Sequence, residues 1–235
     1  MEERIYLVSY PRSGNTWMRF LLANILYPDE DVNYISINKF VPDIHQHQNW
    51  EREGVENPRF VKSHRMLQDD YQQVIYIYRD GRDVALSNFY YYQGEWAAPK
   101  WRGGDVFEAY LERFIEGQEP YGDWKAHVNF WLLRNHKIKF LPVKYEDLIE
   151  NPMVNVRRVA TFSELNVKTE ILSEAIFKSN YKELQKIQPR DSVHPKLGGL
   201  RGAPGGWKEM FTDSQNKAFW DYAGNLMEKL GYEEK

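Results

Sequence analysis

The sequence predicts an α/β protein with a central parallel β-sheet flanked by helices. Four short apolar segments alternate with segments in which apolar residues recur every three or four positions. This alternation is typical of a parallel sheet, because the connection between two parallel strands is usually a helix that covers the sheet. A length of 235 residues suits one such domain with a full core, so we expect a single domain over residues 1–235.

The short apolar segments are predicted to be buried parallel strands, as is typical of sheets covered on both faces. In chain order, these predicted strands are residues 5–10, 59–63, 74–78 and 138–143. Helical periodicity is clearest in residues 18–25, 107–114, 124–132 and 219–230. Two long stretches are predicted to be loops whose length is typical of functional lids, residues 28–58 and 186–206.

The composition narrows the class of protein. The chain carries 31 basic and 34 acidic residues, a formal net charge of −3, which argues against a protein that coats nucleic acid. The absence of cysteine excludes disulfides, zinc–thiolate sites and a cysteine nucleophile. The N-terminal residues lack a signal-peptide pattern, and no stretch approaches the roughly 18 apolar residues of a membrane span. We therefore expect a cytoplasmic protein that binds neither nucleic acid nor membranes.

The first predicted strand leads directly into the segment SYPRSGNTW, residues 9–17. Ser13 and Gly14 stand where the strand turns into a helix, so the N–H groups of residues 14–16 would point out of the helix N-terminus, which attracts anions. Arg12 adds a full positive charge. The pattern predicts a phosphate-binding loop, and the alternative is a plain turn with a capping serine. The Walker pattern of nucleotide triphosphatases is absent, which disfavours triphosphate hydrolysis.

A second loop of the same design follows the third predicted strand, in the segment VIYIYRDGRDVALS, residues 74–87. Arg79 stands at the carboxyl end of the strand, and Ser87 lies eight residues further along the helix, so the pair could reach a second anion. The alternative is that Arg79 and Arg82 pair with neighbouring aspartates on a solvated face. Two anion sites at adjacent strand ends would suit a ligand with phosphates at both ends.

The second predicted strand ends in FVKSHR, residues 60–65. Lys62 and His64 are two positions apart, so on an extended strand they face the same side. An imidazole with a pKa near neutrality is suited to accept a proton, and a lysine is suited to stabilise negative charge, so the pair is a candidate catalytic site. The alternative is a solvated strand end without a role in catalysis.

Five motifs, in order along most of the chain, resemble those of the cytosolic-type sulfotransferases. They are YPRSGNTW (10–17), YRDGRDVALSNFYY (78–91), the central segment 110–131, VKYEDL (143–148) and RGAPGGWKEMFT (201–212). The resemblance implies a P-loop-kinase-like fold with a 5′-phosphosulfate-binding loop. It also implies a sulfate donor, 3′-phosphoadenosine 5′-phosphosulfate (PAPS), which carries phosphate at both ends of its ribose, in agreement with the two anion sites.

The resemblance further assigns residues to the donor. The residues implied to hold its 5′ end are Arg12, Ser13, Gly14, Asn15, Thr16 and Trp17. Those implied at the 3′-phosphate are Arg79, Ser87, Arg201 and Gly202. Tyr145 is implied to lie near the nucleotide, with Ser179 and Tyr181 beside the adenine.

By the same resemblance, His64 is the general base, and Lys62 and Arg12 stabilise the departing phosphate, without a metal. The acceptor is a small phenol or alcohol, with aromatic residues of 88–101 walling its pocket. One alternative is a P-loop-like nucleotide or small-molecule kinase, and another is a non-catalytic nucleotide-binding module.

Some residues depart from the family pattern. Arg12 replaces the usual lysine of the first loop, and Leu200 replaces an arginine, which could weaken donor binding. The family's dimerisation motif is altered at Asp213 and Lys217, so we expect a monomer or a weak homodimer.

Overall fold

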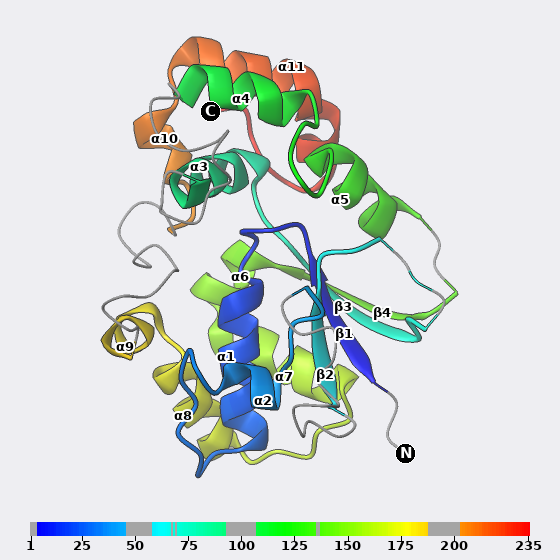
Figure 1. Cartoon of the computed structure of the whole chain (residues 1–235), viewed down its shortest axis with the longest axis vertical. Helices are drawn as coiled ribbons and strands as arrows, with labels where there is room; N and C mark the ends of the chain where they lie inside the picture. The colour runs from blue at the N-terminus through cyan, green and yellow to red at the C-terminus, as the bar shows by residue number, and fades with distance from the viewer. Residues whose placement is uncertain are drawn as a thin grey trace. The chain divides into compact units, whose positions relative to one another are not determined.

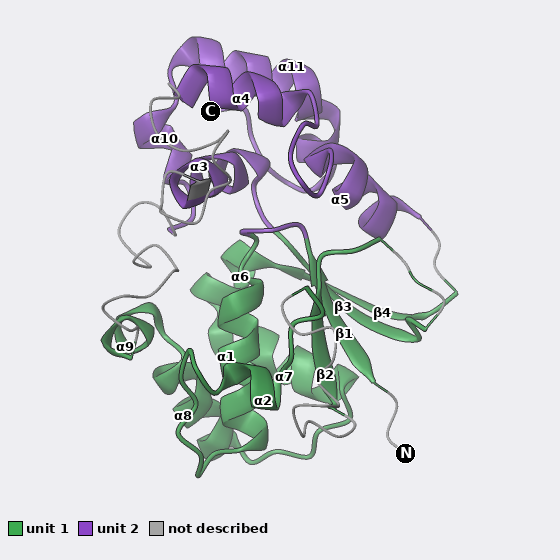
Figure 2. Cartoon of the chain, in the orientation of Figure 1, with its two compact units in different colours: residues 1–9, 13–78, 135–190 green, residues 10–12, 79–134, 191–235 purple. Residues whose placement is uncertain are grey.

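The structure is a computed structural model that describes residues 4–45, 58–66, 68, 70–92, 107–134, 137–187 and 203–235. The chain divides into two compact units (Figure 2). Unit 1 comprises residues 1–9, 13–78 and 135–190, and unit 2 comprises residues 10–12, 79–134 and 191–235.

Unit 1 contains a four-stranded parallel sheet (Figure 1). Its strands are β1 (Ile5–Ser9), β2 (Phe60–Ser63), β3 (Gln73–Tyr78) and β4 (Lys139–Lys144), in the spatial order β2-β1-β3-β4. Each predicted strand is present, and every neighbouring pair is parallel. In register, Leu7 of β1 lies between Lys62 of β2 and Ile75 of β3. The predicted fold class, a parallel sheet flanked by helices, is confirmed.

The helices of unit 1 are α1 (Asn15–Leu26), α2 (Ile37–Phe40), α6 (Tyr145–Glu150), α7 (Pro152–Phe162), α8 (Thr169–Lys178) and α9 (Tyr181–Lys186). Local sequence fixes where several of them begin. Pro152 occupies the first turn of α7, where its missing N–H costs nothing, and the Asn180 side chain caps α9 by accepting from the N–H of Glu183. Helix α1 packs against β1 and α8, and α7 against β4, so the helices bury their apolar faces on the sheet and on one another.

Unit 2 is helical in the residues that the structure describes. Its helices are α3 (Gly81–Tyr92), α4 (Phe107–Ile115), α5 (Trp124–Leu133), α10 (Trp207–Met210) and α11 (Asp213–Lys229). Asp123 caps α5 through the N–H of Ala126, and Thr212 with Gln215 forms a reciprocal capping box at the start of α11.

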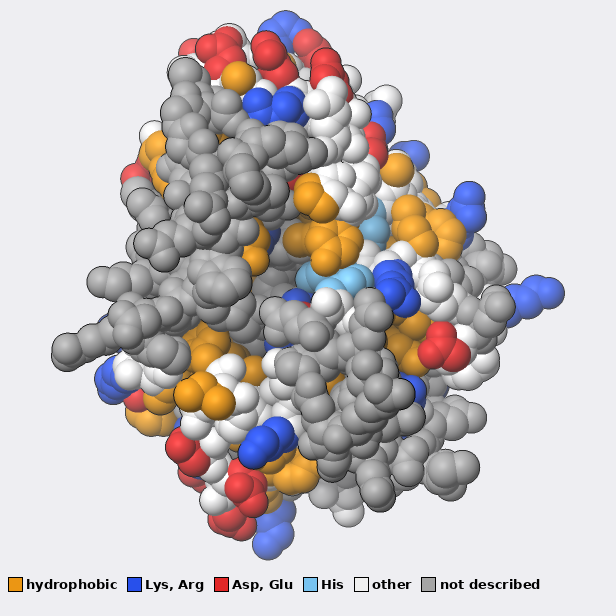
Figure 3. All heavy atoms as spheres, viewed as in Figure 1, with side chains coloured by type: hydrophobic (Ala, Val, Ile, Leu, Met, Phe, Trp, Pro, Cys, Tyr) orange, Lys and Arg blue, Asp and Glu red, His pale blue; other side chains and the backbone are white. Residues whose placement is uncertain are grey.

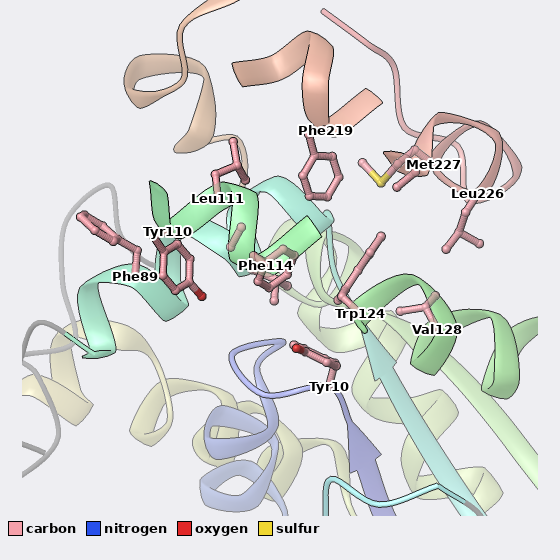
Figure 4. Packing of buried hydrophobic residues seen from close by; sticks show 13 residues of the cluster. Tyr10, Phe89, Tyr110, Leu111, Phe114, Trp124, Val128, Phe219, Leu226 and Met227 are labelled. Atoms are coloured by element: carbon pink, nitrogen blue, oxygen red, sulfur yellow. The ribbon is translucent and has the colours of Figure 1, made fainter. Parts of the chain in front are cut away.

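A largely aromatic core joins α3, α4, α5 and α11 (Figure 4). Phe219 of α11 packs against Phe114 of α4 and Trp124 of α5, with ring centroids 6.4 and 5.9 Å apart. The start of α3 fits closely against the same cluster, since a Cβ atom added at Gly81 would lie 2.6 Å from the Phe219 ring. Packing at this density leaves no room for a side chain at position 81.

The described surface carries side chains of both charges, with hydrophobic side chains between them. On the face seen in Figure 3, acidic and basic side chains are interspersed among the described residues, in keeping with the small net charge. In the described part of the chain, no helix is both long enough and apolar enough to cross a membrane.

We predict that Phe114→Ala lowers the free energy of unfolding by about 3–5 kcal/mol, because the ring is fully buried and its loss leaves a cavity. Chemical denaturation followed by circular dichroism measures the change. Phe177→Ala is the matched control, since this ring is 62% exposed and its loss should change stability by less than about 0.5 kcal/mol. Equal effects of the two substitutions would contradict the assignment of Phe114 to the core.

Candidate donor and catalytic site

Some of the predicted site residues directly follow the carboxyl ends of the strands, where ligands bind in parallel sheets. In unit 1, β1 ends at Ser9, β2 at Ser63 and β4 at Lys144, so His64 and Tyr145 each directly follow a strand. In unit 2, Arg79 is the first residue after β3.

The first loop of unit 1 is shaped by Gly14. Its φ angle is 100°, in the left-handed region that favours glycine, and it precedes the first residue of α1. A Cβ atom at this position would lie 2.4 Å from the ring of Tyr145, so the close approach also requires glycine. The glycine therefore brings Tyr145 against the N-terminus of α1.

Ser13 is the residue of this loop whose chemistry points most directly to a ligand. Its side chain is buried, with 1% exposure, and its hydroxyl has no hydrogen-bond partner among the described residues. A buried hydroxyl without a partner is costly, which is why most such groups are paired. The hydroxyl immediately precedes the N-terminus of a twelve-residue helix, where an anion would be stabilised.

Asn15 ties the loop to the sheet. Its side-chain Nδ2 donates to the carbonyl of Leu7 at 3.0 Å and to the hydroxyl of Ser9 at 3.2 Å. Thr16 and Trp17 follow in the first turn of α1 and are half-buried. The amide of Asn15 thus fixes the loop on β1, a structural role beside the one that the resemblance implies.

His64 is buried and hydrogen-bonded to β1. Its Nδ1 lies 2.8 Å from the carbonyl oxygen of Ser9. Because a carbonyl only accepts, Nδ1 carries the proton and the lone pair lies on Nε2. Burial, and then the nearby charge of Lys62, hold the pKa of His64 well below its ordinary value, although the bond to Ser9 opposes this. The imidazole is therefore neutral at pH 7 and able to accept a proton.

Lys62 is paired with an acid that the sequence analysis did not identify. Its Nζ lies 2.6 Å from Oδ2 of Asp43, whose side chain is 1% exposed. Burial alone would raise the pKa of Asp43, but the charge and hydrogen bond of Lys62, with the charge of Arg19, outweigh it and lower the pKa to about 2. Asp43 is therefore ionised at pH 7.

His45 is the second residue of this site that the sequence did not point to. Its Nε2 accepts from the backbone N–H of His64 at 2.8 Å, and the two rings stack with centroids 5.3 Å apart. One sequence pattern could have pointed to both residues: Asp43 and His45 have the same spacing as Lys62 and His64. The pattern becomes informative only when the two segments are known to be neighbours. The described residues contain no group of His, Asp and Glu suited to hold a metal ion.

In unit 2, Arg12 lies against the helix that carries Ser87. Its Nε donates to the hydroxyl of Ser87 at 3.1 Å, and its guanidinium lies 4.9 Å from the centre of the Tyr91 ring. Its φ angle of 70° is uncommon for a residue other than glycine. Arg12 was predicted at the 5′ end of the donor and Ser87 at its 3′-phosphate, yet the two side chains are in direct contact.

Arg79 and Asp83 anchor the segment that follows Arg201 and Gly202. Arg79 donates to the carbonyl of Ala203 at 3.0 Å and to that of Arg12 at 3.4 Å. The carboxylate of Asp83 accepts from the backbone N–H groups of residues 205 and 207, at 2.8 and 3.0 Å. Burial raises the pKa of Asp83, although the charge of Arg79 opposes this.

Arg82 has a structural role in unit 2. It forms an ion pair with Asp80 at 2.8 Å, stacks 3.5 Å from the centre of the Trp207 ring, and donates to the carbonyls of Glu233 and Glu234 near the C-terminus. The ion pairs considered in the sequence analysis therefore exist, but they are buried and not on a solvated face.

Ser179 and Tyr181 lie near one another in unit 1, in different surroundings. Ser179 is fully buried, and its hydroxyl accepts from the side chain of Asn24 at 3.2 Å. Tyr181 is exposed, and its hydroxyl accepts from Gln185. Arg201 and Gly202 lie outside the described residues, as do Leu200 and most of the aromatic segment, residues 93–101.

Comparison with known proteins identifies the family. A family profile described as the sulfotransferase domain matches residues 2–231. The chain therefore belongs to the sulfotransferase domain family, and the prediction of a PAPS-dependent sulfotransferase is confirmed.

Individual relatives agree with this assignment. The mouse protein named sulfotransferase 1 family member D1 is 29% identical over 242 residues, covering 92% of this chain and 80% of its own. Dog sulfotransferase 1B1 is 29% identical over 241 residues, covering 92% and 80%. The crystal structure of mouse sulfotransferase SULT7A1 complexed with PAP has a TM-score of 0.73 and 23% identity, covering 97% of this chain and 85% of its own. A retinol dehydratase complexed with androsterone and PAP has a TM-score of 0.72 and 18% identity, covering 96% and 81%. These two structures share the fold.

We predict that Asp43→Asn lowers the free energy of unfolding at pH 7 by about 2 kcal/mol. This value follows from the pKa of Asp43, which is about 2 in the folded chain and 3.8 for an ordinary aspartate. Because the folded pKa is the lower one, the stabilisation is complete above about pH 4 and is lost as the pH falls from about 4 to about 2. Denaturant unfolding of both proteins at pH 7 and pH 3 measures the difference, which should be smaller at pH 3.

The matched control is Glu164→Gln, which removes the acid of an exposed 2.6 Å ion pair with Lys139. Solvent screens this pair, so its loss should not change stability measurably. A loss at Asp43 that is equally small, or independent of pH, would show that the buried pair does not stabilise the fold.

Proposed function

We propose that the protein transfers a sulfuryl group from PAPS to the hydroxyl group of a small molecule, a phenol or an alcohol, with His64 as the general base. The observation that carries this proposal is the bond from His64 Nδ1–H to the Ser9 carbonyl, which leaves a lone pair on Nε2 of a neutral imidazole. In a chain of the sulfotransferase family, that is the protonation state a base needs at pH 7.

The first loop is proposed to hold the 5′ end of the donor. Its support is the unpartnered hydroxyl of Ser13 beside the N-terminus of α1, together with the left-handed Gly14 that shapes the turn. The N–H groups of residues 14–16 and the hydroxyl of Thr16 would add donors to the same anion. Tyr145, packed on Gly14, would cover this part of the nucleotide.

Arg79 and Ser87 are proposed to hold the 3′-phosphate, with Arg201 and Gly202 closing over it. The anchoring of residues 203–207 on Arg79 and Asp83 supports this, because it brings the chain that follows Gly202 to Arg79. Ser179 and Tyr181 are proposed to lie beside the adenine. Since Ser179 has no exposed surface, its contribution would be to position the adjacent backbone and not to bind the base directly.

The reaction is an in-line displacement at sulfur. The acceptor oxygen attacks sulfur while Nε2 of His64 takes the hydroxyl proton, and the bond from sulfur to the bridging oxygen breaks. The electron pair stays on that oxygen, and the products are the sulfate ester and 3′,5′-adenosine bisphosphate (PAP). Lys62 and Arg12 are proposed to stabilise the negative charge on the departing phosphate. The proposal uses no metal ion.

Other predictions extend the proposal. The family profile spans both units, which supports a single sulfotransferase domain over residues 1–235. Aromatic residues of 88–101 are proposed to wall the acceptor pocket. A cytoplasmic location, a monomer or weak homodimer, and the lack of nucleic-acid and membrane partners stay predictions from the sequence.

Donor binding is tested by thermal unfolding with PAP or with ATP and Mg²⁺. We expect PAP to raise the melting temperature and ATP to have a much smaller effect; a larger shift with ATP would refute the proposal. Ser13→Ala should weaken PAP binding roughly 10- to 100-fold, because it removes a hydrogen bond to a charged group. Ser163→Ala is the matched control, since its hydroxyl is equally buried and unpartnered among the described residues but lies at the end of α7.

The role of His64 is tested by His64→Ala with labelled PAPS and 2-naphthol, a fluorescent phenol, as acceptor. We expect the transfer rate to fall about 100- to 10,000-fold, because general base catalysis is lost. PAP should still stabilise the variant, since His64 is not assigned to the nucleotide. Transfer at the wild-type rate would refute the assignment of the base.

A further inference from the structure

We propose that Asp43 and His45 are positioning residues that hold the catalytic pair, with His45 acting on the base His64 and Asp43 on Lys62. This inference rests on the proposed function, because it assigns the roles by which the same site works.

Asp43 and His45 lie close to Lys62 and His64 because the backbone of their segment pairs with β2. Residues 42–44 lie beside β2, with an isolated parallel bridge between Asp43 and Lys62. The N–H of Lys62 donates to the carbonyl of Pro42 at 2.8 Å, and the N–H of Ile44 donates to the carbonyl of Lys62 at 3.2 Å. The chain turns at residues 44 and 45, and within this turn the N–H of His45 donates to the side chain of Asp43. This turn places His45 against the backbone N–H of His64.

His45 fixes the main chain of the base. By accepting from the backbone N–H of His64, it holds the residue immediately after β2, where strand pairing has ended. The same bond requires the lone pair of His45 to lie on Nε2 and its proton on Nδ1. Held by this bond at its backbone and by the Ser9 carbonyl at its ring, His64 is restrained at both ends.

Asp43 binds Lys62 with one carboxylate oxygen and His45 with the other. Its Oδ2 binds Lys62, and its Oδ1 accepts from the backbone N–H of His45 at 3.0 Å. Helix α1 holds the residue just before this segment, because the buried guanidinium of Arg19 donates to the carbonyl of Val41 at 2.9 and 2.6 Å. The carboxylate thus connects the position of Lys62 to the position of His45.

Loss of the His45 bond and loss of the Asp43 charge are expected to shift the pKa of His64 in opposite directions. Lys62 from β2 and Asp43 and His45 from the paired segment face the imidazole, and the Ser9 carbonyl of β1 binds it. Burial is the largest cause of its lowered pKa. Loss of the His45 bond would loosen the backbone and admit water, raising the pKa of His64 toward its ordinary value. Loss of the Asp43 charge would lower it further, because that carboxylate favours the protonated ring.

His45→Phe and His45→Gln form a matched pair of variants. Phenylalanine keeps a ring for stacking and loses the acceptor, whereas glutamine loses the ring and can place an oxygen near the former Nε2. We expect kcat with PAPS and 2-naphthol to fall about 10- to 100-fold in His45→Phe, as for a displaced catalytic group. The KM for PAPS should stay within twofold, and His45→Gln should recover most of the rate. A merely structural role would give the two variants equal losses or rescue by phenylalanine, and either result would overturn the proposal.

Nuclear magnetic resonance of ¹⁵N-labelled histidine gives a readout that does not depend on activity. The His64 signals, assigned by their loss in His64→Ala, should show a neutral ring protonated on Nδ1 in the wild type. They should titrate at a higher pH in His45→Phe and at a lower pH in Asp43→Asn. Unchanged titration in both variants would overturn the inference. A wild-type protein that binds PAP but transfers no sulfate would refute the proposed function and leave this readout intact.

Discussion

The hydrogen bond from His64 Nδ1–H to the carbonyl of Ser9 is the interaction on which the candidate site depends. It joins the last residue of β1 to the residue after β2, and the parallel pairing of these two strands sets its length. Ser9 also receives the side chain of Asn15 at the start of α1. Ser9 therefore connects the first loop to the base His64. Its carbonyl also fixes the imidazole tautomer that the proposed chemistry needs.

Several buried charged groups of the described residues have a nearby partner of opposite sign, which makes their burial tolerable. In unit 1, Asp43 is balanced by Lys62 and faces the charge of Arg19. In unit 2, Arg82 pairs with Asp80, and Arg79 lies 3.6 Å from Asp83. Removal of either member of such a pair leaves an uncompensated charge, which is more costly than the pair itself is stabilising. The ion pairs therefore hold the loops in defined positions.

Much of the fold could be predicted because the strands are short apolar runs and the helices carry regular apolar stripes. Ser13 and Gly14 could be placed at the turn from β1 into α1 by the same local patterns. Asp43 and His45 could not be found in this way, because they lie in a polar stretch that only its pairing with β2 brings to Lys62 and His64. The contact between Arg12 and Ser87 was missed for a similar reason, since 75 residues separate them.

The sequence by itself determined the parallel sheet, the helices, the phosphate-type turn and the family, because these depend on local patterns and on motifs in a fixed order. Only the tertiary structure decided which groups meet: the acid on Lys62, the acceptor behind His64, and the carbonyl that selects its tautomer. These contacts join segments that are distant in the chain, and their geometry depends on strand register and loop packing. Sequence periodicity contains no information about either.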